Sequence, residues 1–141
     1  MQSPQLLIYE PHPPRLAELL SEPARLRGWR LRPVNHGAKC LRALREAAPA
    51  VLLLRLGGGN LVRELTLLER AAWLCPDAAL VVVGETANPT LAGLAWDLGA
   101  SFVLFPPQPR DLLPDVVAGF LQSSPRPGQA DQSPWNLSSH A

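Results

Sequence analysis

The hydrophobic pattern of the chain alternates between short apolar runs and longer segments in which apolar residues return at helical spacing. The short runs have the length, the alternation or the β-branched character of strands. The segments between them carry leucine and alanine three or four positions apart, as one face of an amphipathic helix requires. This pattern predicts strands at residues 6–9, 29–34, 51–54, 79–83 and 101–104, and helices at 15–27, 38–48, 61–75, 91–98 and 111–121.

The apolar run at residues 51–54 is central to this pattern. Four consecutive apolar residues that end in a glycine-rich turn are typical of a strand buried on both faces, in the middle of a parallel sheet. Arg55 follows the run, and Asn60 is placed to cap the next helix. Because ligands of open α/β sheets bind outside the carboxyl ends of the strands, residues 55–59 are where a site is expected.

The alternation of strands and helices predicts an α/β fold with a parallel sheet and helices on both faces. We expect the flavodoxin-like (βα)5 three-layer sandwich, whose five strands run in the order 2-1-3-4-5. The strand that contains Pro33 and the strand that contains Phe102 then form the two edges, which suits a residue without an amide donor. Thr90 is predicted to cap the fourth helix and Gly99 to end it.

Length and composition favour one globular domain. The chain has 141 residues, of which 47% are hydrophobic, and the periodic pattern predicts a domain over residues 1–122. Residues 123–141 are rich in Gln, Ser, Pro and Gly without periodicity, so we expect a disordered tail. Trp135 in that tail could form a docking peptide, although an untethered end is the simpler interpretation.

Charge and cysteine content limit the classes of partner. Thirteen basic residues stand against 12 acidic ones, so neither nucleic acid nor an anionic membrane surface is an expected partner. No leader peptide and no apolar run long enough to span a membrane is visible, and a cytoplasmic location is expected. Cys40 and Cys75 both fall on predicted helices, where we expect buried, reduced thiols.

Three segments, in this order and spacing, resemble the receiver domain of bacterial response regulators. Residues 93–104, with the sequence Gly-Leu-Ala-Trp-Asp-Leu-Gly-Ala-Ser-Phe-Val-Leu, are similar to that family's path from the fourth helix into the fifth strand. Residues 35–41 resemble its turn into the second helix, and residues 49–54 resemble its run into the third strand. The likeness covers residues 5–121 and implies a CheY-like fold and a role in phosphorelay signal transduction by a two-component system.

The resemblance also implies where the family's chemistry would lie. In receivers, a histidine kinase phosphorylates an aspartate at the end of the third strand, and two acidic residues after the first strand hold Mg²⁺. Here the nucleophile position falls on Arg55, and the acidic pair falls on Tyr9 and Glu10. A guanidinium cannot accept a phosphoryl group, and its charge repels Mg²⁺. The family's Ser/Thr position falls on Gly84 and its lysine position on Pro106.

Four of these five positions lack the required chemistry, so the chain resembles a degenerate pseudo-receiver without aspartyl phosphorylation. Glu10 keeps its carboxylate, but beside Arg55 it suits a salt bridge better than a metal site. Pro107 matches the family's proline, and Thr86 would replace Gly84 only if its loop shifted. Neither a cofactor nor a metal is expected.

The favoured function is a stand-alone protein-interaction module that binds another signalling protein of unknown identity. Receivers usually signal through their fourth helix, fifth strand and fifth helix, so Trp96, Phe105 and Pro107 are candidates for an exposed apolar patch. An equally weighted interpretation lays Trp96 flat on its own helix and places Phe105 in the core. A homodimer through this face stays open, although no residue argues for it.

The alternative function is a sensor that binds a phosphate-containing small ligand at the strand-end crevice. Backbone N–H groups of Gly57, Gly58 and Gly59, together with the start of the next helix, would face the anion. Arg55 would add positive charge. The competing interpretation treats the glycines as a flexible turn and pairs Arg55 with Glu10.

No enzymatic function is predicted. Glu10, Glu85 and Asp97 are the carboxylates that could approach the crevice, but three loosely placed acids do not define acid–base catalysis. Cys40 and Cys75 lack the spacing of a metal-binding pair.

Overall fold

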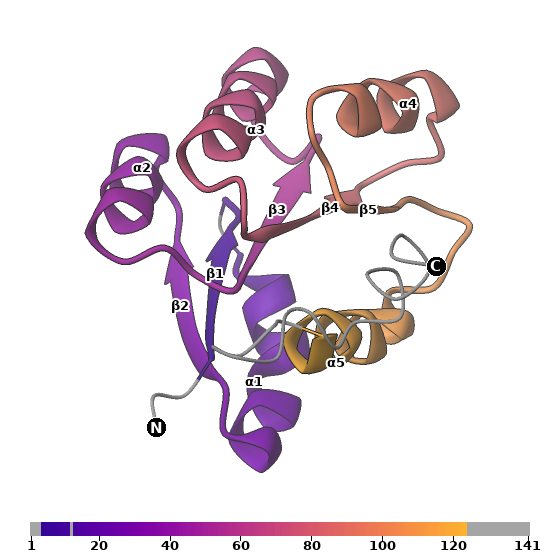
Figure 1. Cartoon of the computed structure of the whole chain (residues 1–141). Helices are drawn as coiled ribbons and strands as arrows, with labels where there is room; N and C mark the ends of the chain where they lie inside the picture. Colours follow the sequence, from indigo (N-terminus) through magenta and orange to yellow (C-terminus); the bar gives the residue numbers. More distant parts are fainter. Residues whose placement is uncertain (1–3, 12, 124–141) are drawn as a thin grey trace, which may run out of the picture.

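The apolar runs form a parallel sheet in the computed structural model of the chain, which describes residues 4–11 and 13–123 (Figure 1). The strands are β1 (Gln5–Tyr9), β2 (Arg30–Val34), β3 (Val51–Leu56), β4 (Ala79–Gly84) and β5 (Phe102–Leu104). The helices are α1 (Arg15–Arg27), α2 (Gly37–Glu46), α3 (Leu61–Leu74), α4 (Pro89–Asp97) and α5 (Leu113–Ser123), the last preceded by a 3-10 turn, η1 (Arg110–Leu112). The strand order β2-β1-β3-β4-β5 confirms the predicted flavodoxin-like arrangement.

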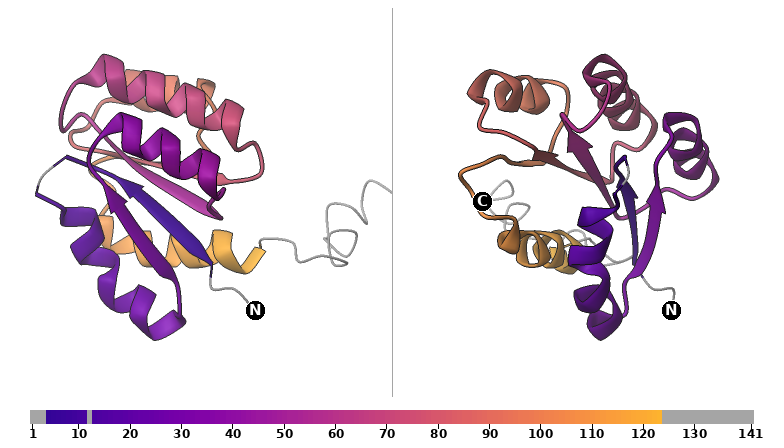
Figure 2. Two further views of the ribbon diagram at one scale, coloured as in Figure 1. Left: turned by 90° about the vertical axis from the view of Figure 1, so that its left-hand side faces the viewer. Right: turned by 180° about the vertical axis from the view of Figure 1, so that it is seen from behind.

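The two faces of the sheet are covered by different helices. Figures 1 and 2 show α2, α3 and α4 over one face and α1 and α5 over the other. All six residues of β3 are buried: Leu52, Leu54 and Leu56 pack under α2, α3 and α4, whereas Val51 and Leu53 pack toward α1 and α5. Burial on both faces explains why this strand is a continuous apolar run rather than an alternating one.

The two predicted edge strands lie at the edges of the sheet. Pro33 pairs in register with Ile8 of β1, and no strand of residues 4–11 and 13–123 lies on its other side, so its missing N–H breaks no ladder. β5 pairs with β4, with Val103 opposite Val82, and ends the sheet in the part of the chain that the structure describes. The topology therefore follows the sequence pattern at both ends.

Side-chain caps begin two of the helices. Asn60 caps α3 as predicted, because its Oδ1 accepts the Arg63 N–H at 3.1 Å. The predicted Thr90 cap is wrong: Asn88 caps α4, with its Oδ1 accepting the Leu91 N–H at 3.0 Å. Pro89 fits the first helical position, where no amide donor is needed, so α4 begins one residue before Thr90.

Three further details differ from the predicted elements. β3 extends past residue 54 and includes Arg55, which therefore lies in the strand itself. Cys75 lies just after α3 rather than in the helix, although both cysteines are buried free thiols as expected. α5 runs to Ser123, one residue beyond the predicted domain boundary, and the tail with Trp135 lies outside the described residues. No helix among the described residues has both the length and the apolarity to cross a membrane.

Candidate functional site

Arg55 lies at the carboxyl end of the central strand, where the sequence predicted a site. Its side chain is only 10% exposed. Nε and Nη2 both contact Oε1 of Glu85, and Nη1 lies 3.7 Å from Oε1 of Glu10. Nη1 also donates to the Pro13 carbonyl at 3.4 Å. The guanidinium is thus held by two carboxylates of its own chain, which come from the segments after β1 and β4.

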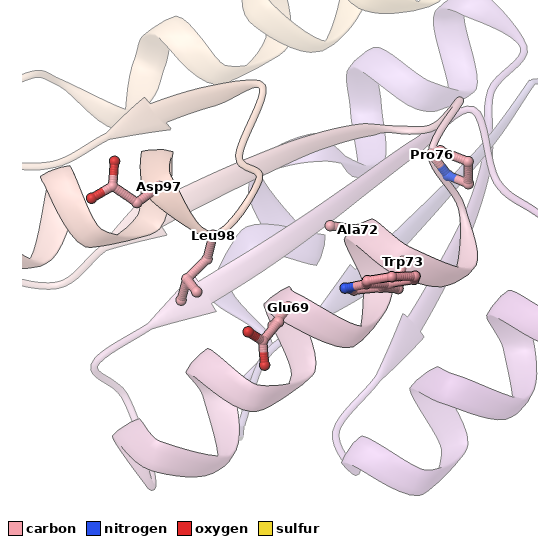
Figure 3. Close-up of a pocket in the computed structure, with 6 residues that line it drawn as sticks. All are labelled: Glu69, Ala72, Trp73, Pro76, Asp97 and Leu98. Carbon is pink, nitrogen blue, oxygen red and sulfur yellow. The ribbon is translucent and has the colours of Figure 1, made fainter.

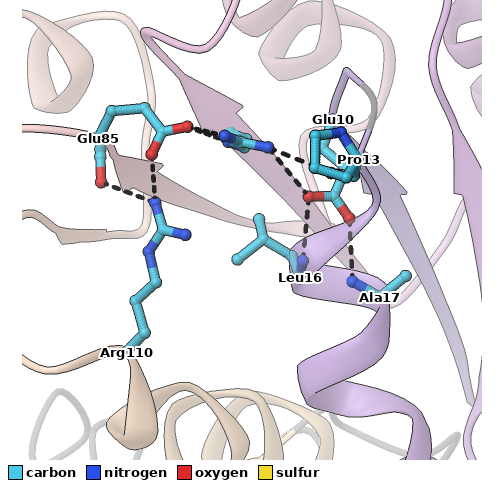
Figure 4. A network of polar contacts seen from close by, with 8 residues as sticks. Glu10, Pro13, Leu16, Ala17, Glu85 and Arg110 are labelled. Carbon is cyan, nitrogen blue, oxygen red and sulfur yellow. Dashed lines mark hydrogen bonds and ion pairs between the residues drawn. The ribbon is translucent and has the colours of Figure 1, made fainter.

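Glu85 connects Arg55 to a second cation. Its Oε2 accepts from Nη2 of Arg110 at 2.7 Å, and the same nitrogen donates to the Gly84 carbonyl at 3.3 Å (Figure 4). Glu85 follows β4 directly, whereas Arg110 begins the 3-10 turn before α5. The chain Glu10–Arg55–Glu85–Arg110, here called the ion network, therefore ties four segments together across the strand ends.

Glu10 is committed to the start of a helix as well as to Arg55. Its Oε1 accepts the Leu16 N–H at 3.0 Å, and its Oε2 accepts the Ala17 N–H at 2.9 Å (Figure 4). α1 has no cap from its own preceding residue, Pro14. A carboxylate at a helix N-terminus satisfies free amides and is favoured by the helix dipole, which offsets the cost of burying Glu10 at 2% exposure.

The glycine turn after β3 encloses another carboxylate, that of Glu64. Its Oε1 accepts the Gly57 N–H at 2.8 Å, and the residue is 1% exposed. Burial raises the pKa of Glu64, and the hydrogen bonds from Gly57 and Gly59 oppose that rise. The Gly57 N–H, which the alternative function would offer to an anion, is thus already hydrogen-bonded to a side chain of this protein. Binding of a phosphate ligand at residues 55–59 stays a prediction, and it would require this carboxylate to move.

Close packing explains the glycine at position 58, and backbone conformation explains the glycine at position 57. A Cβ on Gly58 would lie 3.1 Å from both Nε of Arg55 and Oε1 of Glu85, so a larger residue would crowd the ion pair. Gly57 has φ +99°, a backbone conformation that other residues rarely adopt. The glycines serve the ion network and the turn together.

The remaining positions of the family's chemistry are structural. Tyr9 is half-buried against the core under α2 and α3, and burial raises the pKa of its hydroxyl. Gly84 makes room for the ring of Phe105, which a Cβ would approach to 2.2 Å. Pro106 is half-buried before a cis peptide bond to Pro107. Among the described residues, no hydrogen bond or ion pair joins Tyr9 or Pro106 to the ion network.

The candidate interaction face is smaller than predicted. Trp96 is 49% exposed and Pro107 is exposed, but Phe105 is buried at 6% exposure. Phe105 must therefore be removed from the exposed patch, because its ring fills the space that Gly84 leaves beside β4. This burial agrees with the core interpretation of Phe105 that the sequence left open.

Sequence reasoning found Arg55, Glu10 and the glycine turn, and missed much of what surrounds them. The sequence places Glu85 among the acids near the crevice but does not pair it with Arg55. The parallel register sets Gly84 opposite Leu56, so Glu85 follows β4 close to the end of β3, and this register is the signal that could have predicted the pair. Arg110 and Glu64 carried no such signal, since each reaches the site from a helical segment through its side chain. The described residues contain no group of three or more His, Cys, Asp or Glu side chains that could hold a metal ion.

Solved structures of receiver domains share this fold. A CheY-like receiver domain protein from Methanospirillum hungatei JF-1 superposes with a TM-score of 0.70 at 17% identity, over 86% of this chain and 96% of that one. A response regulator from Thermotoga maritima gives a TM-score of 0.73 at 16% identity, over 86% and 100% of the two chains. NtrX from Brucella abortus gives 0.72 at 21% identity, over 87% of this chain and 28% of its own.

The architecture is therefore that of response regulator receiver domains, as the sequence motifs suggested. At these identities the likeness establishes the fold and leaves function to the site. No protein-family model matches the sequence, and no curated protein matches it significantly.

Proposed function

We propose that this chain is a pseudo-receiver that acts in the cytoplasm as a protein-interaction module of signal transduction, without aspartyl phosphorylation and without catalysis of its own. The observation that carries the proposal is Arg55 at the carboxyl end of β3, where the resemblance to receivers puts the phosphoacceptor. A guanidinium offers no nucleophile, and its contacts with Glu10 and Glu85 use the carboxylates nearest to it.

The ion network supports a fixed rather than a switched state. In a phosphorylated receiver, the negative charge that arrives at the third strand would be the signal. Here a buried positive charge is paired with carboxylates from the segments after β1 and β4, and Arg110 pairs with the second of these carboxylates from the segment before α5. Such a domain would present one constant surface to its partner.

The test measures phosphoryl uptake and partner binding on the same protein. The chain is incubated with Mg²⁺ and acetyl phosphate beside a phosphorylatable receiver as positive control, and intact mass is recorded. We expect the control to gain a phosphoryl group and this chain to gain none. Partner capture by the wild-type chain should be equal with and without acetyl phosphate. A phosphoryl group on any carboxylate of the strand-end site would overturn the proposal.

A further inference from the structure

A groove runs between α2 and α3, beginning at the first turns of both helices. It has a volume of about 720 Å³. Leu41 and Leu67 lie along it, and Val62 at its rim is 73% exposed. Removing the apolar side chain of Val62 from water would be favourable, so its exposure suits contact with a partner. The groove therefore combines an apolar floor with an apolar rim.

The charges along this groove are all of one sign. Four cations line it: Lys39 and Arg42 from α2, and Arg63 and Arg70 from α3. None of its lining residues is acidic, whereas the whole chain carries 13 basic and 12 acidic residues. Within residues 4–11 and 13–123, none of the four cations forms an ion pair. Nearly a third of the basic side chains thus gather on one surface without partners.

The spacing of these cations matches a helix. Arg63 and Arg70 are two turns apart on α3, which places them about 10 Å apart along the helix axis. Lys39 and Arg42 are three positions apart on the facing helix, and so are neighbours on its surface. Two cationic rims on either side of an apolar floor fit a helix with one apolar stripe and acidic flanks.

We propose that the groove between α2 and α3 docks an acidic amphipathic helix of a partner protein. This inference rests on the proposed function, since it names the chemistry of the partner. The four cations are spread over both rims, whereas a single small anion would need several of them to point at one place. The spread therefore disfavours a small anion as the ligand. The apolar floor and the balanced charge of the whole chain disfavour nucleic acid, which requires phosphate contacts over a wide basic surface.

A second copy of the chain is the other occupant to be distinguished. A second groove lies between α3 and α4, on the opposite side of α3, and is lined by two acids, Glu69 and Asp97, together with Trp73 of α3 (Figure 3). Trp73 is 84% exposed. The acidic groove of one copy could in principle meet the basic groove of another, so the experiment must measure self-association as well as peptide binding.

The test uses a synthetic helical peptide of 18 residues, cross-linked to stay helical, with a leucine stripe flanked by glutamates. A second peptide carries lysine in place of each glutamate. Binding to the full chain is measured by calorimetry and mapped by amide NMR. We expect saturable binding of the acidic peptide with shifts along α2 and α3, and at least tenfold weaker binding of the basic peptide.

Variants separate the groove from the rest of the surface. Arg42→Glu/Arg70→Glu should weaken the acidic peptide at least tenfold and strengthen the basic one. Arg30→Glu/Arg45→Glu changes net charge equally at exposed positions outside the groove and should alter binding less than twofold. Val62→Glu tests the apolar rim at a site too exposed to affect folding, and it should also weaken the acidic peptide.

Several results would overturn the proposal. These are no saturable binding, equal binding to Arg42→Glu/Arg70→Glu, tighter competing binding of inorganic polyphosphate or duplex DNA, and self-association that this variant abolishes. Peptide shifts confined to the surface around Trp96 would also overturn it while leaving the proposed function intact. Phosphoryl uptake from acetyl phosphate, conversely, would contradict the proposed function and leave the groove result standing.

Discussion

Glu85 holds Arg55 across the carboxyl ends of two neighbouring strands, with one carboxylate oxygen against two guanidinium nitrogens. The pair joins the centre of the sheet to the segment after β4, and Arg110 grips the other oxygen of Glu85 at 2.7 Å. The carboxyl end of the central strand thus carries a buried positive charge. Because Arg55 is paired with carboxylates of the same chain, its charge is already neutralised by Glu10 and Glu85.

Replacement of Arg55 should be costly. Arg55→Ala leaves Glu10 and Glu85 near one another without their shared cation, and removing one partner of a buried ion pair typically costs about 3 kcal/mol. The free energy of unfolding from urea titration measures this. Arg45→Ala, at an exposed position without an ion pair among the described residues, should change it by less than about 0.5 kcal/mol. A loss below about 1 kcal/mol for Arg55→Ala would show that the pair contributes little beyond its own desolvation.

The two ends of the ion network should differ in strength. Arg110 is 30% exposed and its charge is partly screened by solvent, so Arg110→Ala should cost about 1 kcal/mol, less than Arg55→Ala. A double-mutant cycle of Arg55→Ala and Arg110→Ala reports whether both act through Glu85. We expect coupling of about 0.5 kcal/mol or more, since both cations share one carboxylate. Strict additivity would mean that Glu85 serves the two cations independently.

The raised pKa of Glu64 predicts that the stability of the protein depends on pH, with a sign set by the burial of this carboxyl. Burial raises its pKa in the folded protein above the ordinary 4.5, so the unfolded chain releases this proton first as pH rises. The folded state then binds more protons, and the contribution of Glu64 to stability falls as pH rises from 4.5 through the raised pKa.

The variant Glu64→Gln removes this titration. Its amide oxygen can still accept the Gly57 N–H, and the loss of the bond from Gly59 shifts stability by the same amount at every pH. Relative to the wild type, the variant should gain stability between acidic and neutral pH, as judged from urea midpoints measured at intervals of pH. Below pH 4.5 the difference between the two proteins should become constant. A wild type that gains stability over the variant with rising pH would contradict the direction of the shift.

The sequence predicted the fold because the signals for this fold are local and repeated. The buried run in β3, Pro33 at an edge and Asn60 before α3 each report on their own element, and together they define one topology. The Arg55–Glu10 pairing was also accessible, because adjacent parallel strands bring their ends together. The side chains of Arg110 and Glu64 were not predicted to reach the site, because each is long and contacts a residue on another element that the local pattern does not indicate.

Phe105 shows a second limit of sequence reasoning. An aromatic residue after an edge strand can lie on the surface or fold inward, and its own neighbours along the chain do not decide between the two. Gly84 decides it, since only a glycine at the end of β4 leaves space for the ring. Gly84 ends β4 whereas Phe105 follows β5, so the pattern of either segment alone could not reveal their contact.

This contact yields a prediction with a matched control. Gly84→Ala would place a Cβ 2.2 Å from the Phe105 ring, and the required shift of a buried aromatic should cost about 2 kcal/mol. Gly93→Ala, in α4 with no atom within 4 Å of the new Cβ, should instead stabilise the protein by about 0.5 kcal/mol. Urea denaturation measures both, and the indole N–H resonance of Trp96, assigned by NMR among the four tryptophans of the chain, reports whether α4 moves. A neutral Gly84→Ala would show that the ring is not held in the position described, and the assignment of Phe105 to the core would fail.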